Sequence, residues 1–324
     1  MDINFLPEYG KLFERTLNGE YTEFRFESAD GVVSHAFIKR SLEAFGMGDR
    51  FDAITPYGYG GDRIVTLTGN REALIADYKS AFDSYCRDNR IVSLFTRFNV
   101  FEDNATAFRD CYDSVEFSRK VVVVRLVEDF FKTEFTGEAR RGCNVAAERE
   151  SVTVKIDETG ETMDDFKELY RNFMRSKETD EFYLFEDEFY SGVKRDLLGK
   201  FILVNTYSYA ELLSRTLVLF HGKTAYYFLL GRSGECRSSY SGSVAMREMC
   251  RYVKAAGCDC MILGGGTSSA LNDSLLHYKK QFSKSPLLDF HIGKRVFEKQ
   301  VYAELCKAKG LEPSLQGFFP AYRE

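Results

Sequence analysis

The sequence lacks any apolar run of the length that a membrane span requires. No window approaches about 18 consecutive apolar residues. The first residues, MDINFLPEYGKLFERTL, also lack the basic start and the long apolar core of a secretory leader. Because both features are missing, we expect a cytoplasmic protein without an integral membrane segment.

Proline and net charge are also low. Only 5 of the 324 residues are proline, and no low-complexity segment interrupts the chain, so we expect no extended linker. The length allows about two compact domains, and the 44% hydrophobic residues supply their cores. A net charge of -5 argues against a surface dominated by attraction to nucleic-acid phosphates, although it permits a local basic patch. We therefore expect a globular protein that does not bind DNA.

The eight cysteines contain no CxxC pair. The closest two, Cys258 and Cys260, lie in an apolar, strand-like run with no partner pair at the spacing of a zinc site. Buried cysteines of this kind are usually inert thiols. We expect reduced, non-catalytic cysteines and no bound metal.

Several other enzyme motifs are missing. The four histidines include no HExxH pair, and no GxSxG is present, which argues against a histidine-rich zinc hydrolase and an α/β-hydrolase. Gly222-Lys223-Thr224 resembles the end of a phosphate loop, but Leu217 stands where its first glycine belongs, so a hairpin turn fits better. Ser269 likewise replaces the last glycine of a GxGxxG dinucleotide motif. These departures argue against nucleotide hydrolysis and a Rossmann fold.

Helical and strand patterns alternate along the first half of the chain. We expect helices over residues 5–17, 71–87 and 137–150, and strands over residues 21–27, 32–38, 51–55, 91–98 and 120–126. The valine run of the last strand predicts burial on both faces. A strand over 151–157 then opens the second half, so we place a domain boundary near residue 150.

The second half repeats this mixed α/β order. We expect helices over residues 164–175, 186–198, 243–256, 271–282 and 296–309, and strands over 201–206, 210–221, 224–231, 259–263 and 287–292. The predicted domains are residues 1–150 and 151–309. The three aromatic residues of GFFPAY, residues 317–322, predict that the tail 310–324 packs back on the first domain.

Three consecutive glycines, Gly264, Gly265 and Gly266, precede the helix expected over residues 271–282. Glycine lets the backbone approach a ligand closely, although a tight turn at a strand end would also explain it. At about 100° per residue, one face of this helix carries Leu271, Leu275, Tyr278 and Phe282. Lys279 then lies at the margin of the buried face and Lys280 in solvent. A lysine at that margin is suited to bind a phosphate or a developing oxyanion.

A second candidate anion site lies in GRSGECRSSYSGSV, residues 231–244. This run ends at a predicted helix start, where backbone N–H groups and the helix dipole favour negative charge. Arg237, Ser241 and Gly242 are the candidate ligands of a donor phosphate. An ordered loop without a ligand is the alternative.

These motifs together resemble a known family. The element order from residue 151 to 309 resembles the GNAT acyltransferase fold, in which two central strands splay apart around the acyl donor. CDCMILGGG followed by NDSLLHYKKQFS resembles the second GNAT-like domain of the Fem-type peptidoglycan aminoacyltransferases. Asp52 with TPYGYGG and the basic segment GEARRGCNVAAE resemble features of their first half. The resemblance implies two tandem GNAT-like domains, each a mixed α/β (α+β) sheet with splayed central strands.

The resemblance also implies acyl transfer to an amine, with roles for particular residues. Lys279 matches the lysine that stabilises charge in the transfer step, and Tyr278 matches its aromatic neighbour. Gly264, Gly265 and Gly266 fall on the donor side, and backbone N–H groups of residues 224–231 are suited to hold the acyl carbonyl. Tyr57 and Tyr59 are candidates for the acceptor cleft. Three residues remain open as general base: Glu235, Tyr240 and His277.

Two departures from the family leave the donor open. The chain has no insertion matching the helical arm of Fem proteins that is thought to meet transfer RNA. CRSSYSGS also lacks the (Arg/Gln)-x-x-Gly-x-(Gly/Ala) form by which acetyl-CoA enzymes hold pyrophosphate. The donor is therefore either aminoacyl-tRNA or acyl-CoA, with no permanently bound cofactor, and the acceptor a small-molecule or peptide-like amine.

Three classes of function follow. An aminoacyl or acyl transferase acting on a cell-wall precursor or related amine is favoured. An acetyl-CoA-dependent N-acetyltransferase of a small amine or sugar is the first alternative. An inactive ligand-binding protein on the same fold is the second, because a fold by itself does not establish activity.

Overall fold

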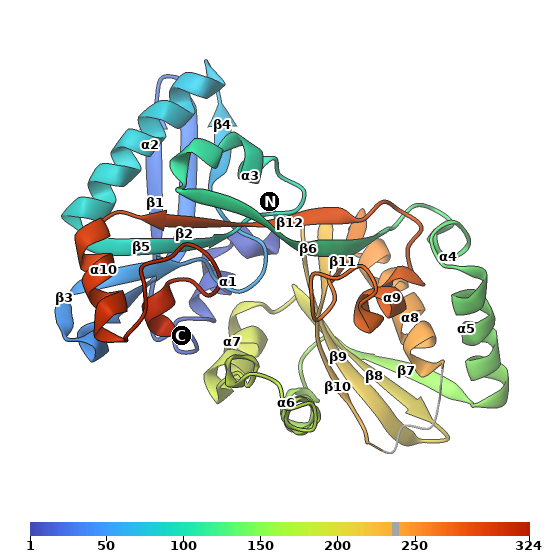
Figure 1. Ribbon diagram of the computed structural model, residues 1–324. Helices are drawn as coiled ribbons and strands as arrows, with labels where there is room; N and C mark the ends of the chain where they lie inside the picture. Colours follow the sequence, from blue (N-terminus) through green and yellow to red (C-terminus); the bar gives the residue numbers. More distant parts are fainter. Residues whose placement is uncertain (235–239) are drawn as a thin grey trace. The chain divides into compact units, whose positions relative to one another are not determined.

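The computed structural model describes residues 1–234 and 240–324 (Figure 1). The described chain forms two compact units. Unit 1 contains Met1–Ile3 and Arg119–Leu288, and unit 2 contains Asn4–Ser118 and Asp289–Glu324. The chain passes from unit 2 to unit 1 inside strand β6 (Ser114–Arg125) and returns at the start of β12 (Leu288–Val296).

Unit 2 is built on a mixed sheet with the strand order β1, β2, β3, β5 and β12. The first four strands span Gly19–Ser28, Gly31–Leu42, Met47–Ile54 and Ile91–Arg97. A short strand, β4 (Arg63–Leu67), pairs with β2. Strands β3 and β5 run parallel, whereas β2 pairs antiparallel with β1, β3 and β4 and β12 pairs antiparallel with β5.

The long helix of unit 2, α2 (Arg71–Asp88), begins where the Asn70 side chain accepts a hydrogen bond from the N–H of Ala73. Every fourth residue from Leu74 onward is buried, which makes one apolar stripe against the sheet. The remaining helical segments are η1 (Ile3–Phe5), α1 (Pro7–Lys11), η2 (Glu43–Phe45), α3 (Asn104–Ala107), η3 (Arg109–Cys111), α10 (Lys299–Ala308) and η5 (Ala321–Arg323).

The last residues of the chain pack into unit 2. Phe319 and Tyr322 share a buried apolar cluster with Leu42 and Val92, which come from β2 and β5. Lys294 is 1% exposed, and its amine donates to the Leu315 carbonyl at 2.5 Å. The tail is therefore held by apolar burial and by a buried cation.

A buried carboxylate also anchors the tail. Asp52 on β3 has no exposed surface and accepts hydrogen bonds from Arg40 Nε at 2.7 Å, the Tyr322 hydroxyl at 3.0 Å and Arg323 Nε at 2.5 Å. Two cations facing one carboxylate compensate its loss of hydration. Asp52, which belongs to the motif that resembles the Fem family, thus has a structural role in unit 2.

Unit 1 is built on a second mixed sheet with the strand order β6, β11, β10, β9, β8 and β7. These strands include β7 (Val152–Asp157), β8 (Phe201–Ser208), β9 (Glu211–His221), β10 (Thr224–Arg232) and β11 (Cys260–Gly264). The valine run of β6 is buried along its whole length, as the sequence predicts. Gly222 and Lys223 form the tight turn of the β9–β10 hairpin, since His221 pairs with Thr224. This confirms the hairpin reading of that segment.

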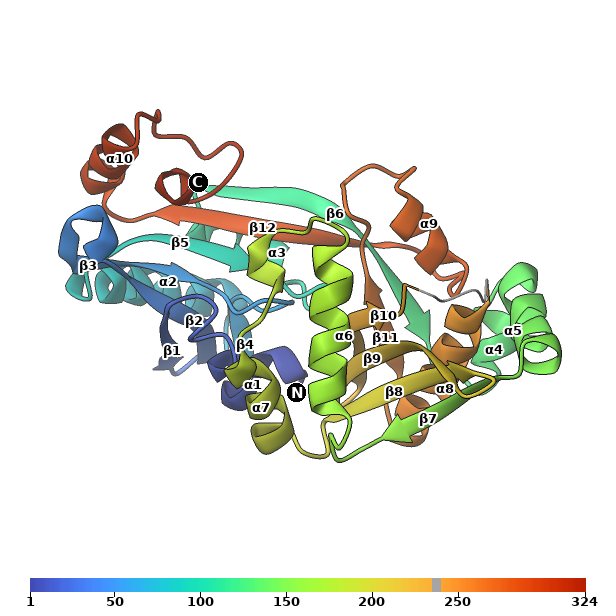
Figure 2. The same cartoon turned by 90° about the horizontal axis from the view of Figure 1, so that it is seen from below.

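Helices cover both faces of the unit 1 sheet (Figure 2). α6 (Met163–Arg175) lies on one face, and α8 (Ser241–Ala255) lies on the other. α5 (Gly137–Arg149) packs beside α8. The other helical segments are α4 (Phe130–Thr133), η4 (Glu181–Tyr183), α7 (Asp187–Asp196) and α9 (Ser274–Lys280).

Three features differ from the sequence expectations. The unit boundary lies at Ser118 and Arg119 and not near residue 150, because β6 continues from one unit into the other. Residues 289–309, expected in the second domain, belong to unit 2, where β12 pairs with β5. The helix expected over residues 5–17 is only the five-residue α1, followed by turns. Boundaries of this kind depend on long-range strand pairing that a local pattern does not report.

The seven described cysteines are free thiols, and all except the half-buried Cys260 are buried. Burial raises the pKa of the Cys143 thiol to about 11 and that of Cys260 to about 12. These thiols stay protonated near neutral pH and are poor nucleophiles. Among the helices of the described chain, none has the length and apolar character needed to cross a bilayer.

We predict that Asp52→Ala strongly destabilises unit 2. The substitution leaves the buried Arg40 guanidinium without its counter-charge and releases the tail, which should lower the free energy of unfolding by about 3–5 kcal/mol. Equilibrium denaturation in urea measures the change.

Asp49→Ala is the matched control, because Asp49 lies on the same strand and also pairs with two arginines, Arg50 at 3.1 Å and Arg90 at 2.5 Å. Its side chain is 58% exposed, so its loss should cost under about 1 kcal/mol. Equal effects of the two substitutions would contradict the anchoring role of Asp52.

Candidate active site

The parallel ladder between β10 and β11 ends early. Thr224, Ala225 and Tyr226 pair with Cys260, Met261 and Ile262, and β10 then continues to Arg232 while it remains paired with β9. A bulge between Tyr227 and Leu229 interrupts the register with β9. A bulge bends its strand and increases the local twist. The two central strands of unit 1 therefore part after three residue pairs.

The corresponding parallel pair of unit 2 stays closed. β3 and β5 pair up to Ile54 and Phe95, and the N–H of Thr55 then donates to the Phe95 carbonyl at 3.0 Å. Beyond that point Gly60 forms a parallel bridge with Phe98. The sequence led us to expect splayed central strands in both domains, but the central strands part in unit 1 and stay paired in unit 2. The candidate site therefore lies in unit 1.

The predicted acceptor residues Tyr57 and Tyr59 lie in the turn that closes this ladder in unit 2. The Tyr57 carbonyl accepts a hydrogen bond from the Tyr9 hydroxyl at 2.5 Å, and the N–H of Tyr59 donates to Asn4 Oδ1 at 3.0 Å. Both tyrosines are half-buried. These contacts explain the order of the turn, and acceptor binding by Tyr57 and Tyr59 stays a prediction.

The glycine loop, defined as residues 264–273, follows β11 at the point where the strands have parted. A Cβ on Gly265 would lie 2.7 Å from the Lys120 carbonyl of β6, and one on Gly266 would collide with Asp273 Oδ1. Contacts this short exclude any side chain at either position. The glycines are therefore required by the packing of the loop itself.

Asp273 organises the rest of the loop. Its Oδ2 accepts the N–H groups of Thr267 and Ser268, both at 3.0 Å, and its Oδ1 accepts the N–H of Leu276 at 2.9 Å. The Thr267 hydroxyl, with these other donors, holds the pKa of this carboxyl well below its ordinary value. Asp273 is thus both the centre of the loop and the cap of α9.

This cap corrects the helix predicted over residues 271–282. α9 begins at Ser274, and Leu271 and Leu275, expected on the buried face, are 69% and 37% exposed. The buried side of α9 is formed by Leu276 and Lys279. The helical-wheel prediction assumed that the helix begins at Leu271, because the local sequence alone does not show that Asp273 caps it and that it begins at Ser274.

Lys279 and Lys280 nevertheless differ in burial as predicted. Lys279 is 8% exposed and its amine donates to the Gly265 carbonyl at 2.7 Å, whereas Lys280 is exposed. Burial lowers the pKa of Lys279 to about 8; Asp273 opposes this shift and Arg119 adds to it. Arg119 also donates to the Gly266 carbonyl at 3.1 Å. Two cations therefore bind consecutive carbonyls of the glycine loop.

Tyr278 connects α9 with the start of α8. Its hydroxyl occupies the space into which a side chain at position 242 would extend, so Gly242 is required there. Burial raises the pKa of Tyr278, and the positive charge of Arg232 opposes the shift. Tyr278 and Arg232 also act on Tyr227. Burial and Tyr278 raise the pKa of Tyr227, and the positive charge of Arg232 lowers it. The structure thus adds Tyr227, which packs against the same buried apolar cluster as Tyr278, and the exposed Arg232 at the end of β10 to the residues near the candidate site.

Sequence reasoning did not find Tyr227 and Arg232. Tyr227 lies within TAYYFLLGR, where nothing distinguishes it from other core aromatics, and Arg232 precedes the loop in which Arg237 was chosen. Their position near the carboxyl end of a predicted strand could have identified them, because ligands of open α/β sheets bind at such strand ends.

The predicted anion site at the start of α8 is partly described. Arg237 and the possible base Glu235 lie outside the described residues. Ser241 is 5% exposed, and the Tyr240 ring lies against Gly142 of α5. Of the other two possible bases, Tyr240 is half-buried and His277 is exposed on α9. The Tyr278 hydroxyl therefore lies against the first turn of α8 at Gly242, whereas the Tyr240 ring lies against α5.

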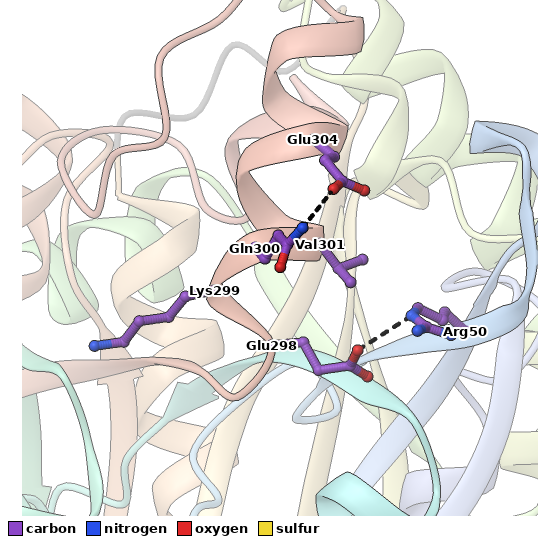
Figure 3. A pocket seen from close by; sticks show the side chains of 6 residues that line it. All are labelled: Arg50, Glu298, Lys299, Gln300, Val301 and Glu304. Atoms are coloured by element: carbon purple, nitrogen blue, oxygen red, sulfur yellow. Dashed lines mark hydrogen bonds and ion pairs between the residues drawn. The ribbon is translucent and has the colours of Figure 1, made fainter.

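A pocket in unit 2 lies apart from the predicted residues (Figure 3). It is lined by Arg50, Glu298, Lys299, Gln300, Val301 and Glu304. Arg50 Nε pairs with Glu298 at 3.1 Å, and the Gln300 amide donates to Glu304 at 3.3 Å. Its charged groups largely neutralise one another, so we do not assign it a role in catalysis.

Comparison with known proteins agrees with this geometry. Residues 134–280 match the model of the acetyltransferase (GNAT) domain, so the chain carries an acyltransferase domain. This range contains β10, β11, the glycine loop and α9. No curated protein matches the chain.

Solved structures are similar over nearly the whole chain. The crystal structure of FemX superposes with a TM-score of 0.70 at 12% identity and covers 93% of this chain and 94% of its own. The C-terminal domain of a putative lysylphosphatidylglycerol synthetase from Agrobacterium fabrum gives 0.60 at 13% identity, with 98% and 95% covered. L-PGS from Bacillus licheniformis gives 0.54 at 14% identity, with 90% and 92% covered. These similarities confirm the Fem-like, mixed α/β fold expected from the sequence.

We predict that Lys279 contributes strongly to the transfer step and that Lys280 does not. Lys279→Ala removes a buried cation beside the parted strands and should lower kcat/KM about 10²- to 10³-fold. Lys280→Ala is the matched control and should change the rate little, because its amine is in solvent. Thermal unfolding of both variants separates lost catalysis from lost stability, and equal small effects on rate would refute the assignment.

The lowered pKa of Lys279 also predicts a pH dependence. Its amine carries charge below about pH 8 and loses it above, whereas an unperturbed lysine stays charged to about pH 10.4. The part of kcat/KM that depends on this charge should therefore fall as the pH rises through about 8. The same profile measured for Lys279→Ala should lack this fall, and a fall of the same size in the variant would contradict the prediction.

Proposed function

We propose that the protein transfers an aminoacyl group from an activated ester to an amine acceptor, with the donor bound in unit 1. The observation that carries this proposal is the parting of β10 and β11 after three pairs, within a matched GNAT domain. Beyond Tyr226, β10 no longer pairs with β11. Its backbone N–H groups are suited to hold the donor carbonyl as its oxygen becomes negative.

The transfer needs one bond exchange and one proton transfer. The neutral acceptor nitrogen attacks the carbonyl carbon, the new C–N bond forms, and the bond from carbon to the leaving oxygen breaks. The nitrogen loses a proton, and the leaving oxygen gains one. Tyr278 is the proton donor we propose, because it is the neighbour of Lys279 on α9 and a tyrosine hydroxyl is protonated at neutral pH. Lys279 supplies a positive charge that stabilises the negative charge developing in the transfer step.

The start of α8 favours an aminoacyl ester over a CoA thioester. A pyrophosphate held at a helix start needs open backbone N–H groups there. Here the hydroxyl of Tyr278 lies against Gly242, Ser241 and Ser243 are buried, and the segment lacks the pyrophosphate-binding form. Aminoacyl-tRNA is therefore the donor we propose. The name of one similar structure, a domain of a putative lysylphosphatidylglycerol synthetase, also refers to an aminoacyl group.

The Fem-like fold supports an amine of a cell-wall precursor or a related peptide as acceptor. Acetyl transfer from acetyl-CoA is the second candidate, because the matched domain model is that of an acetyltransferase.

Binding and transfer with matched donors test the proposal. Purified protein is incubated separately with charged tRNA, uncharged tRNA and acetyl-CoA, and binding and transfer to a panel of amines are measured. We expect charged tRNA to bind and react, with an affinity that falls as salt increases.

The other outcomes decide between the alternatives. Transfer from acetyl-CoA would replace our proposal with the acetyltransferase. Absence of transfer from both donors would overturn it in favour of an inactive ligand-binding protein.

A further inference from the structure

The glycine loop is held by hydrogen bonds to groups of opposite charge, a carboxylate and two cations. Its N–H groups and hydroxyls at Thr267 and Ser268 face the Asp273 carboxylate, and its carbonyls at Gly265 and Gly266 face two cations. Loops are usually the more mobile parts of a fold. This one is fixed by charge-assisted hydrogen bonds, which are about twice as strong as neutral ones.

On one side, the Asp273 carboxylate is buried, with 8% of the residue exposed, and it accepts five hydrogen bonds. Four of them come from the backbone and hydroxyl groups of Thr267 and Ser268, and the fifth comes from the N–H of Leu276. A carboxylate at this position therefore fixes the loop and the first turn of α9 together. The position of Tyr278, one turn further along α9, depends on the same group.

On the other side, Lys279 and Arg119 come from different elements. Lys279 lies on α9 and reaches back to Gly265 at 2.7 Å, and Arg119 lies on β6 and reaches Gly266 at 3.1 Å. Each amine or guanidinium binds one carbonyl. The loop is thus attached both to the helix that follows it and to the strand beside it.

The loop lies at the carboxyl end of β11. Because β10 and β11 are parallel, this end and the parted end of β10 lie at the same edge of the sheet. Ligands of open α/β sheets bind at such an edge. Two cations and one carboxylate also leave a net positive charge beside the opening, which suits the phosphate groups that both candidate donors carry.

We propose that Asp273 is a positioning residue for acyl transfer, which acts with Lys279 and Arg119 to hold the glycine loop and Tyr278 against the bound donor. This inference rests on the proposed function. Asp273 itself does not touch the donor. It sets where the loop lies and where α9 begins, so its loss should weaken donor binding and slow transfer while the fold persists.

Three substitutions test the role of Asp273. Asp273→Asn removes the charge and keeps one acceptor oxygen, so we expect kcat/KM for the donor to fall about 10²-fold. Thr267→Val removes one hydroxyl bound to the carboxylate and should lower kcat/KM about 10-fold. Thr267→Ser keeps that hydroxyl and should restore the parent value within about twofold. Lys280→Ala on α9 is the control and should match the parent.

A double-mutant cycle then separates positioning from a purely local structural contact. If Thr267 acts through Asp273, Thr267→Val should have little further effect in the Asp273→Asn background. The donor KM should rise in both single variants when it is measured at a temperature at which thermal unfolding shows each variant to be fully folded. Additive effects, or unchanged kcat/KM in Asp273→Asn, would overturn the inference.

Hydrogen exchange makes the test independent of turnover. The amides of Thr267 and Ser268 should exchange slowly in the parent and faster in Asp273→Asn, and fast exchange in the parent would overturn the inference. If the parent reacts with neither donor, the proposed function fails, and with it the part of the inference that concerns the donor. If the parent reacts but Asp273→Asn reacts equally well, only the positioning inference fails.

Discussion

The candidate site depends on one constraint, the end of the parallel ladder between β10 and β11 after three residue pairs. In unit 2 the β3–β5 pairing is extended by the N–H of Thr55, which donates to the Phe95 carbonyl, and by an isolated parallel bridge between Gly60 and Phe98. In unit 1 the bulge beyond Tyr227 turns β10 away while β9 follows it. Backbone groups and the carboxyl ends of two strands therefore meet at one edge, where a donor can bind.

The groups around that opening come from distant parts of the chain. Arg119 comes from β6, Tyr227 and Arg232 from β10, and Tyr278 with Lys279 from α9. Arg119 and Lys279 are placed by hydrogen bonds to loop carbonyls, and the Tyr278 hydroxyl lies against Gly242. The site is thus built from the same interactions that stabilise the fold, and substitutions there need stability controls.

Sequence patterns predicted the order and kind of most elements correctly. The alternation in β1, the fourfold spacing in α2 and the valine run in β6 each report which face is buried, and such periodicities are local. The mixed α/β fold, the Fem-like resemblance and the acyltransferase domain followed from that order and three motifs. The short strand β4, RIVTL, was missed although its β-branched residues favour a strand, and three of its five residues are exposed in the structure.

The sequence by itself determined that Lys279 and Lys280 would differ in burial, because adjacent helical residues point about 100° apart. It also indicated that bare backbone and positive charge belong together near residue 265. Tertiary structure decided how the glycines and the lysine are used. The glycines make room for Asp273 and for β6, and the buried Lys279 binds the Gly265 carbonyl. Tertiary structure also decided where unit 1 begins and why position 242 needs glycine. Those answers depend on contacts between residues far apart in the chain, which local periodicity does not encode.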